Sequence, residues 1–444
     1  MSKWQKTDFG RIPKDWNLKK VADIKGEDKR AIAMGPFGSN IKAENFVAYG
    51  VPVIRGTNLN YAKYVDGDFV YLTEEKADDL LGSNCKAGDL VFTHRGTIGQ
   101  VGLIPSGKFP RYVISQSGMK LTVNPDLMDI NFLFYFFKSD FGQYQILKYE
   151  SQVGVPSISN PLTSLKEIEV PSPSLSEQKA IAAVLSSLDD KIDLLHRQNL
   201  TLEAMAETLF RQWFGEEAQE GWECGTLGDV AINVRSSVKT SDIQADTKYI
   251  GLEHIDRRNI ALNQYGYGAE VSSKKSAFER HDILFGKLRP HFHKVCFTPF
   301  AGICSTDILV IRPKHHKYFA YCLFVFFQND VVEYANLGSG GTRMPRTDWS
   351  ILKNYPIVIP DSNSLERFND VVLPAIKRIS HNQLQIKTLE KLRDTLLPKL
   401  MCGEVQVSWS NDKKHPCESA EPLARLGGSE PHATTRPCRQ PTKE

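Results

Sequence analysis

Cysteine is scarce in this sequence, and its positions follow no metal-binding or disulfide pattern. The 444 residues include 8 cysteines, none of them in a C-x-x-C pair. This usage favours a reducing compartment, and the first residues lack the apolar core of a signal peptide, so we expect a cytoplasmic protein. His291, His293, Cys296 and Cys304 have the spacing of no zinc site, so we expect no bound metal.

Long hydrophobic runs are also missing. The most apolar stretches are Phe132–Phe137 and Tyr321–Phe327, and each ends within three residues at a polar or charged side chain. Because a membrane span needs about 20 apolar residues, these stretches predict buried helix segments and no membrane partner. Dense aromatic runs are costly to expose, which also assigns them to the core.

The sequence has no strong excess of one charge and no recognisable catalytic motif. Its net charge is +3, so any surface that binds phosphates must be local. A G-x-x-x-x-G-K-[ST] loop for nucleotides is absent, as are the N-P-P-Y and D-P-P-Y tetrapeptides of amino-methyltransferases. We interpret Asp189, Asp190 and Asp193 as a charged helix face rather than as catalytic carboxylates. We therefore predict no catalytic residue.

The chain contains a long, diverged internal repeat. KAGDLVF at Lys86–Phe92 is similar to ERHDILF at Glu279–Phe285, and FFKSD ending at Asp140 is similar to FFQND ending at Asp330. The order and spacing of these pairs are preserved. A repeat of this length predicts two copies of one structural unit.

Each copy opens and closes with a similar phrase. Trp16 precedes VADI and Trp222 precedes LGDV near the starts of the two copies. At their ends, EIEVPSPSLSEQ is similar to PIVIPDSNSLER, which aligns Pro171 with Pro360. These phrases bracket the two units.

The middle of each copy predicts a mixed α/β domain with a β-rich centre. Short strand-like runs such as VPVI, DLVFTH, MKLTV and DILVIRP are bounded by Gly, Pro and Asn, and one aromatic-rich helix follows them. We expect two similar domains at 1–171 and 217–361, long helices at 172–216 and 362–407, and a disordered tail at 408–444. The tail is short of large apolar residues.

The two closing segments predict long helices with a coiled-coil seam. Ser174 or Ser176 is the expected N-cap of the first helix, and Pro374 is expected to kink the second. Seam residues recur at steps of three and four, and they are Ile181, Leu185, Leu188, Ile192, Leu195, Asn199, Leu202 and Leu209 in the first helix and Ile379, Asn382, Ile386, Leu389 and Leu396 in the second. An antiparallel pair would bury both seams. We predict that Asn199 and Asn382 lie close together, because a lone polar seam residue fixes register.

Two α/β segments, each followed by a long helix, resemble the specificity subunits of type I restriction-modification enzymes. The resemblance covers residues 10–407 and is carried by VPSPSLSEQKAIAAVLSSLDDKID from Val170, LRDTLLPKLMCGEV from Leu392, GPFGSN from Gly35 and GDLVFTHRGTIGQVG from Gly88. The second copy departs from the pattern, with DSNSLERF for SPSLSEQK and LFGKLRP for VFTHRGT. These departures make the transfer of individual residue roles to the second copy less direct.

The resemblance implies a DNA-binding subunit without catalytic activity. Each domain is expected to read one half of a bipartite site in double-stranded DNA, and the helices are expected to set the distance between the halves and to dock two methyltransferase subunits. S-adenosylmethionine would bind in those subunits, and ATP with Mg²⁺ in restriction subunits, which translocate and cleave DNA. The resemblance implies no cofactor in this chain.

Loops that combine cationic side chains with groups able to bond base edges are the candidate DNA contacts. In the first copy they are Ser39, Asn40, Arg55, Asn58, Thr93, His94, Arg95, Thr97, Gln116, Ser117, Gln152 and Ser157, and in the second Lys274, Lys275, Lys287, Arg289, His291, Ser305, Thr306, Thr342, Arg343 and Arg346. Ordinary solvated loop residues are the alternative for any one of them.

Two other functions stay open at the level of the sequence. The chain could be a DNA methyltransferase or nuclease with an unrecognised active site, or a coiled-coil scaffold that binds only proteins. Methylation by the purified chain alone would favour the enzyme. Failure of the assembled complex to protect a particular DNA sequence would favour the scaffold.

Overall fold

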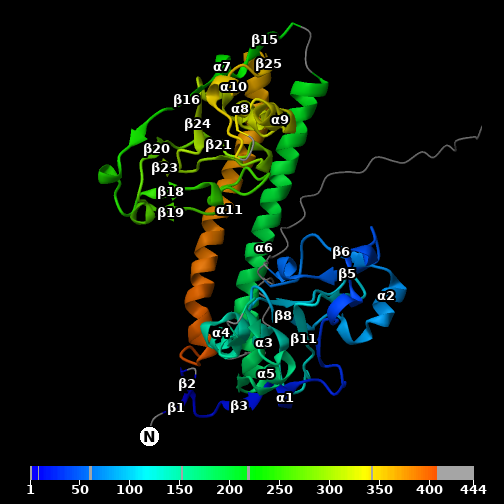
Figure 1. Ribbon diagram of the computed structural model, residues 1–444. Coiled ribbons are helices and arrows are strands. Elements are labelled where there is room, and N and C mark those ends of the chain that lie inside the picture. The colour runs from blue at the N-terminus through cyan, green and yellow to red at the C-terminus, as the bar shows by residue number, and fades with distance from the viewer. Residues whose placement is uncertain are drawn as a thin grey trace, which may run out of the picture.

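Two globular domains lie at opposite ends of a pair of long antiparallel helices (Figure 1). This computed structural model describes residues 3–8, 10–59, 63–151, 154–217, 221–341 and 344–407. The predicted disordered tail at 408–444 lies outside these ranges. No helix within them combines the length and the apolarity that a bilayer span requires.

The first domain is built on two four-stranded sheets. One has the order β6 (Val70–Leu72), β5 (Val51–Ile54), β10 (Tyr112–Ile114), β7 (Asn84–Cys85), and the other β4 (Ile32–Met34), β11 (Gly118–Leu121), β8 (Leu90–Thr93), β9 (Val101–Leu103). Its helices are α1 (Val21–Ile24), α2 (Glu74–Asp79), α3 (Ile130–Lys138), α4 (Asp140–Leu147) and α5 (Pro161–Glu167). Short antiparallel pairs complete it: β1 (Trp4–Thr7) with β2 (Gly10–Pro13), β3 (Asn17–Lys20) with β14 (Glu169–Ser172), and β12 (Glu150–Ser151) with β13 (Ser157–Ile158).

The second domain repeats this topology. Its sheets have the orders β19 (Gly266–Tyr267), β18 (Lys248–Ile250), β23 (Gly302–Cys304), β20 (Lys275–Phe278), β17 (Ser237–Val238), and β16 (Ala231–Asn233), β24 (Ile308–Pro313), β21 (Ile283–Gly286), β22 (Val295–Phe297). Strands β15 (Glu223–Thr226) and β25 (Pro356–Ile359) pair, and the helices are α7 (Leu227–Val230), α8 (Phe319–Phe326), α9 (Asn329–Leu337) and α10 (Trp349–Leu352). In both domains two adjacent central strands, β5 with β10 and β18 with β23, run parallel. The predicted internal repeat is therefore a repeat of structure.

A buried aspartate before a central strand marks the same place in both copies. Asp89 precedes β8, where its carboxylate accepts hydrogen bonds from the Lys86 amide at 3.0 Å and the Thr122 hydroxyl at 2.6 Å. Asp282 precedes β21, and its carboxylate accepts from the Arg312 Nε at 2.7 Å. Both aspartates are buried and hydrogen-bonded. The sequence alignment of Asp89 with Asp282 is thereby confirmed.

The alignment of Pro171 with Pro360 is wrong by two residues. Ser174 caps the first long helix, and its hydroxyl accepts a hydrogen bond from the Glu177 amide at 3.3 Å. Asp361 caps the second, so Pro360 corresponds to Pro173, each directly before the N-cap. The N-cap residues define the structural alignment of the two segments, and it differs from the alignment that sequence similarity alone suggested.

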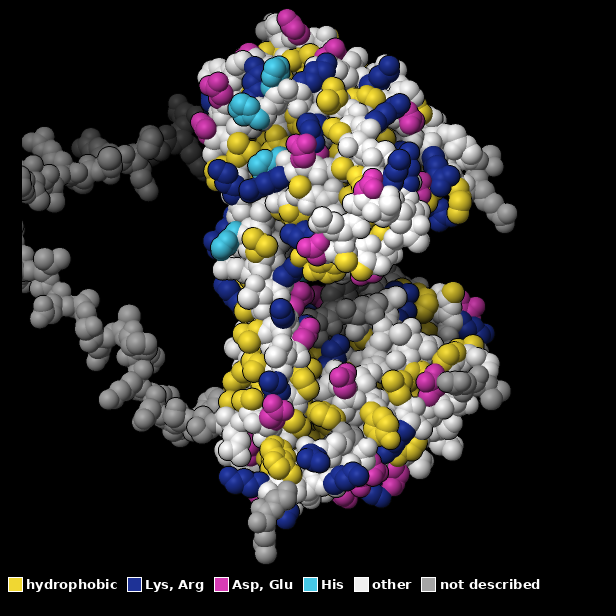
Figure 2. Space-filling model, turned by 90° about the vertical axis from the view of Figure 1, so that its left-hand side faces the viewer, with side chains coloured by type: hydrophobic (Ala, Val, Ile, Leu, Met, Phe, Trp, Pro, Cys, Tyr) yellow, Lys and Arg dark blue, Asp and Glu magenta, His cyan; other side chains and the backbone are white. Residues whose placement is uncertain are grey.

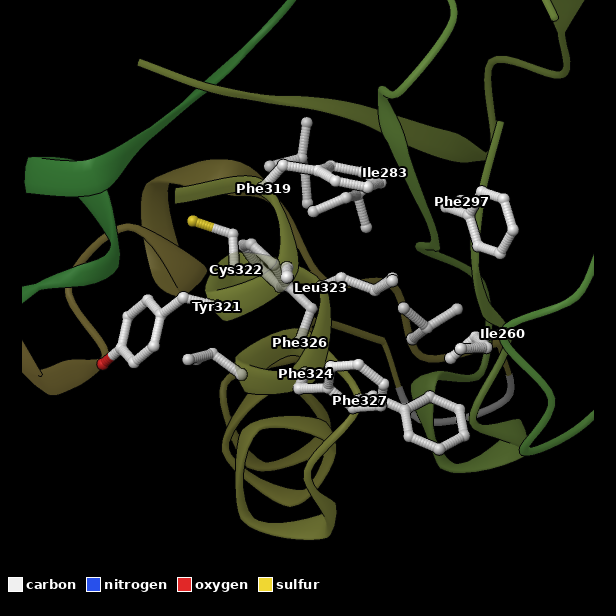
Figure 3. Close-up of a cluster of buried hydrophobic side chains, with 14 of the residues drawn as sticks. Ile260, Ile283, Phe297, Phe319, Tyr321, Cys322, Leu323, Phe324, Phe326 and Phe327 are labelled. Carbon is white, nitrogen blue, oxygen red and sulfur yellow. The ribbon is translucent and has the colours of Figure 1, made fainter. Parts of the chain in front are cut away.

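The aromatic runs form the cores, as predicted. All residues from Phe132 to Phe137 and from Tyr321 to Phe327 are buried. In the second domain, Figure 3 shows Phe319, Leu323 and Phe326 of α8 gathered with Ile283 and Phe297 of the neighbouring strands. These cores join one sheet of each domain, the one that contains β8 or β21, to the long helices.

The two long helices, α6 (Leu175–Arg211) and α11 (Ser362–Met401), pack side by side along most of their length (Figure 1). Helix α11 continues through Pro374. Six of the thirteen named seam residues are buried in apolar contacts, namely Ile181, Leu185, Ile192, Leu195, Ile379 and Ile386. Leu188, Leu202, Leu209, Leu389 and Leu396 are half-buried. Ile192, Leu195 and Ile386 pack together between the two helices, with Leu389 against them.

Polar pairs set the register of this seam. The Asn382 Nδ2 donates to the Asn199 Oδ1 at 2.8 Å, and both residues are buried, which confirms the predicted pairing. Asp190 and Asp193 are exposed, as expected of a charged face, whereas the interpretation is wrong for Asp189. Its carboxylate is buried because it accepts from the Arg393 guanidinium at 2.9 Å and the Tyr135 hydroxyl at 2.7 Å.

The asparagine pair predicts a non-additive response to substitution. Asn199→Leu leaves the buried Asn382 amide without its main partner, so this variant should lose about 1–3 kcal/mol of stability. The double variant Asn199→Leu/Asn382→Leu removes both polar groups and should recover most of that loss. Urea unfolding followed by the helical circular dichroism signal measures both. A double variant less stable than either single variant would contradict this account.

Candidate nucleic-acid interface

Three loops of the first domain converge at the carboxyl ends of β5, β8 and β10. The His94 amide donates to the Ser117 carbonyl at 2.9 Å, and the Ser115 amide donates to the Ile54 carbonyl at 2.9 Å. The segment at β13 joins them, because the Ile158 amide donates to the His94 carbonyl at 2.8 Å. Backbone bonds therefore hold these loops as one surface.

The second domain builds the same framework with other residues. The Lys287 amide donates to the Asp307 carbonyl at 2.8 Å, and the Ser305 amide donates to the Ile250 carbonyl at 2.9 Å. The Thr347 amide closes the set by donating to the Lys287 carbonyl at 3.1 Å. Lys287 thus occupies the place of His94, and Asp307 that of Ser117.

A cleft of about 480 Å³ opens where the loops meet in the first domain, lined by Ile41, Phe46, Val53, Arg55, Arg95, Ser115, Gln116 and Ser117. An adjoining hollow of about 380 Å³ shares Arg55 and Arg95 and reaches Thr97. Both arginines and Thr97 are exposed, and among the described residues that line these hollows none is acidic. Two guanidinium groups beside polar side chains suit phosphates and the edges of guanine.

Gln116 fixes one wall of the cleft. Its Nε2 donates to the Gly38 carbonyl and, at 3.4 Å, to the Ile41 carbonyl. These bonds hold the short turn Gly38–Asn40, to which Ser39 belongs, against the converging loops. Asn40 is exposed there. The predicted residues of GPFGSN and SQSG are thereby brought together.

Two predicted DNA contacts point into the protein. Asn58 is 1% exposed, and its Nδ2 donates to the carbonyls of Asp66 and Asp68, both at 3.0 Å. Thr93 is also buried, and its hydroxyl donates to the Thr97 carbonyl. Their polar groups are used to hold the loops in shape, so direct contact with DNA does not fit their positions.

His94 and Lys275 are the other two predicted contacts that the structure buries. The His94 Nε2 lies 3.1 Å from the Gln116 carbonyl oxygen, and burial lowers the pKa of the ring, which favours its neutral form. The Lys275 Nζ donates to the Ser273 hydroxyl at 2.7 Å and lies 5.4 Å from the centre of the Tyr249 ring. The polar groups of both side chains are therefore used inside the protein.

The remaining candidates of the second domain surround its framework. Lys274, His291, Thr306 and Arg346 are exposed, and Lys287, Arg289 and Ser305 are half-buried. The Arg346 Nε lies 3.2 Å from the Asp307 carboxylate. This surface therefore carries an acidic group where the first domain has Ser117, and the two domains differ in charge at their centres.

Four further candidates complete the prediction. Ser157 is half-buried and lies opposite Arg95 in a backbone bridge. Gln152, Thr342 and Arg343 lie outside the described residues. DNA contact by the exposed candidates of both domains stays a prediction.

The sequence prediction missed other side chains on these surfaces. Ile41 and Phe46 line the cleft of the first domain, and Arg257 and Arg258 lie exposed in the second. The adjacent arginines in DRRN were a usable signal, because paired cations in a turn are typical of phosphate contacts. Apolar lining residues carry no such signal in the sequence.

Cys296 and Cys304 lie in a hydrophobic cluster of the second domain with Ile250 and Val310. His293 is buried nearby, and its Nε2 lies 3.0 Å from the Phe327 carbonyl oxygen. Within the described ranges, no three histidine, cysteine or acidic side chains gather as metal ligands. Cys296, Cys304 and His293 are buried in the core of the second domain.

Both copies match one family of domains. Residues 13–204 and 219–391 match the type I restriction modification DNA specificity domain. The chain belongs to this family. Its two specificity domains can therefore be compared position by position.

Relatives of the specificity family extend over most of the chain. The MjaIX type I restriction enzyme specificity subunit of Methanocaldococcus jannaschii is 28% identical over 439 residues, covering 91% of this chain and 97% of that protein. The HindI specificity subunit of Haemophilus influenzae is 21% identical over 463 residues, covering 85% and 100%. The crystal structure of a type I S subunit from M. genitalium has the same fold, with a TM-score of 0.55 at 17% identity over 87% of this chain and 96% of that one.

Proposed function

We propose that this chain recognises DNA sequence for a type I restriction-modification complex, and that each domain reads one half of a two-part site. One loop framework, built twice with different side chains, carries the proposal. The equivalent backbone contacts of the two domains align Arg95 with Leu288 and Ser117 with Asp307. Domains that share a framework but present different groups to base edges would read different bases.

The helical pair supports a fixed spacing between the two halves. At ~1.5 Å per residue, the 37 residues of α6 span about 55 Å. One turn of B-DNA is about 34 Å long, so the pair is long enough to hold two readers on successive turns. The seam of α6 and α11 would then act as the ruler of the complex.

Exposed apolar side chains on the helices suit two equivalent partners. Met205 of α6 follows its N-cap Ser174 by the same number of residues as Leu392 of α11 follows its N-cap Asp361. The two side chains are 42% and 45% exposed. Around Met205, the residues Leu200 and Leu209 line a shallow apolar hollow. We propose that each of the two sites docks one methyltransferase subunit, because apolar patches on exposed helices are typical of protein interfaces.

The chemistry would lie in those partners. The chain belongs to the type I specificity family, and we infer that, like other specificity subunits, it has no catalytic activity of its own. We infer that methyltransferase subunits supply S-adenosylmethionine and that restriction subunits, in a host that makes them, supply ATP and Mg²⁺. This chain would bind neither cofactor and would act in the cytoplasm, which its scattered cysteines favour.

Substitution in the first domain should change one half of the methylated motif. Arg55→Ala or Arg95→Ala removes a guanidinium from the cleft, so methylation should weaken or become degenerate in one half-site while the other half keeps its sequence. Methylome sequencing of cells that carry the complete complex measures this.

Arg111→Gln is the matched control, because Arg111 pairs with Asp78 and Glu74 of α2 at the outer edge of the same domain (Figure 1). Its motif should stay that of the wild type. Changes spread over both half-sites in the Arg95 variant, or DNA methylation by the purified chain without partners, would contradict the proposal.

The docking sites predict a stepwise loss of partners. Met205→Asp and Leu392→Asp should each reduce the complex from two methyltransferase subunits to one, and the double variant should bind none, because a charge is costly in an apolar interface. Native mass spectrometry measures the stoichiometry of the complex. Leu81→Asp is the control, because Leu81 is an exposed leucine that does not belong to α6 or α11. Two bound subunits in the double variant would contradict this docking surface.

A further inference from the structure

The loop between β21 and β22 holds two side chains where the first domain has glycine. Arg289 and His293 both have φ of 51°, and the matching loop has Gly96 and Gly99, both with φ of 86°. Backbone bonds establish the match, since the Arg289 amide donates to the Pro345 carbonyl at 2.8 Å and the Gly96 amide to the Pro156 carbonyl at 2.9 Å. Left-handed backbone disfavours any residue with a Cβ.

Side chains kept at a strained position are expected to have a use there. His293 has a structural one, because it is buried and its ring bonds the Phe327 carbonyl. Arg289 is half-exposed, and its guanidinium lies 5.8 Å from the centre of the Phe292 ring. The matching position of the first domain, Gly96, has no side chain.

Arg289 is part of a cationic cluster around Phe292. The Arg257 guanidinium lies 4.0 Å from the centre of the same ring, and the His291 ring meets it edge to face at 4.6 Å. Burial lowers the pKa of the neighbouring Lys294, and the charge of Arg257 lowers it further. Two guanidinium groups therefore lie beside one aromatic ring.

The two guanidinium groups differ from their neighbours in having no acidic partner. Arg258 pairs with Glu207 at 3.0 Å and Arg346 with Asp307 at 3.2 Å. In the described part of the chain, no carboxylate forms an ion pair with Arg257 or Arg289. Asp256 and Glu253 act on the nearby Lys294 but pair with neither guanidinium. Guanidinium groups that lie beside an aromatic ring and have no ion-pair partner suit a phosphodiester, whose oxygens they can bond in pairs.

The place of the cluster determines which part of the DNA it would meet. Arg258, next to Arg257, pairs with Glu207 on α6, and the Ile260 amide donates to the Glu203 carboxylate on the same helix at 2.9 Å. The cluster thus extends from the converging loops toward the helical pair. Figure 2 shows Lys and Arg interspersed with Asp and Glu over both lobes on the face in view.

We propose that Arg257 and Arg289, held against Phe292, bind the DNA backbone on the spacer side of the second half-site and anchor the complex without reading bases. This inference rests on the proposed function. The first domain, with Gly96 in the place of Arg289, has no counterpart of this arginine. This backbone contact would therefore have no equivalent at the first half-site.

The test uses the full chain assembled with its modification subunits. Arg289→Gly installs the residue of the first domain and relieves the backbone, so its melting temperature should equal or exceed that of the wild type. Arg257→Gln changes an exposed side chain. Each variant should raise Kd by the same factor for duplexes with and without the methylated motif. Each should also make the plot of log K against log salt shallower, reducing the magnitude of its slope by about one.

Arg367→Gln is the control, because its guanidinium also lies over a ring, 5.6 Å from the centre of Trp213, but at the outer end of the helical pair. It should leave affinity and slope unchanged. Wild-type affinity and slope in the Arg257 and Arg289 variants would overturn the proposal, as would a motif that becomes degenerate in methylome sequencing, which indicates base reading. A wild-type complex that binds all duplexes equally would instead contradict the proposed function. Comparing the Kd of the Arg257 and Arg289 variants with that of the wild type would still decide the role of the cluster.

Discussion

Asn199 and Asn382 meet near the middle of an otherwise largely apolar seam, and the Asp189–Arg393 pair joins the same helices nearer one end. Polar pairs in a seam are satisfied in only one alignment, because sliding either helix by a turn would leave buried amides and charges unpaired. Both domains pack against these helices. The register of α6 and α11 therefore determines how far apart the two converging-loop surfaces lie.

The domains themselves combine a shared support with different surfaces. Asp89 and Asp282 lock the same turn, and equivalent backbone bonds hold the loops in both copies. The side chains on that support diverge, as Ser117 against Asp307 illustrates. The domains also differ at a left-handed backbone position, where the second domain has Arg289 and the first has a glycine, the residue that this conformation favours. A duplicated scaffold with independent surfaces suits a protein that must recognise two unrelated short sequences.

Much of this architecture could be predicted from the sequence, because it depends on patterns that repeat. The heptad spacing predicted the seam and the Asn199–Asn382 contact, and the duplicated phrases predicted two like domains. Side-chain direction in loops was less accessible. Asn58 and His94 have the composition of DNA contacts, yet they satisfy backbone carbonyls inside the protein. The adjacent arginines of DRRN could have pointed to Arg257, whereas its contact with Phe292, distant in sequence, depends on the fold.

The central claim is that the helical pair sets the distance between two readers. It is tested by inserting one heptad into each helix, C-terminal to Asn199 and N-terminal to Asn382, which preserves the seam and the asparagine contact. Seven residues add about 10 Å, close to three base pairs of DNA. Methylome sequencing should then show the same two half-site sequences separated by a spacer about two to three base pairs longer. An unchanged spacer, in a variant whose helical content has risen as the insertion requires, would contradict the account.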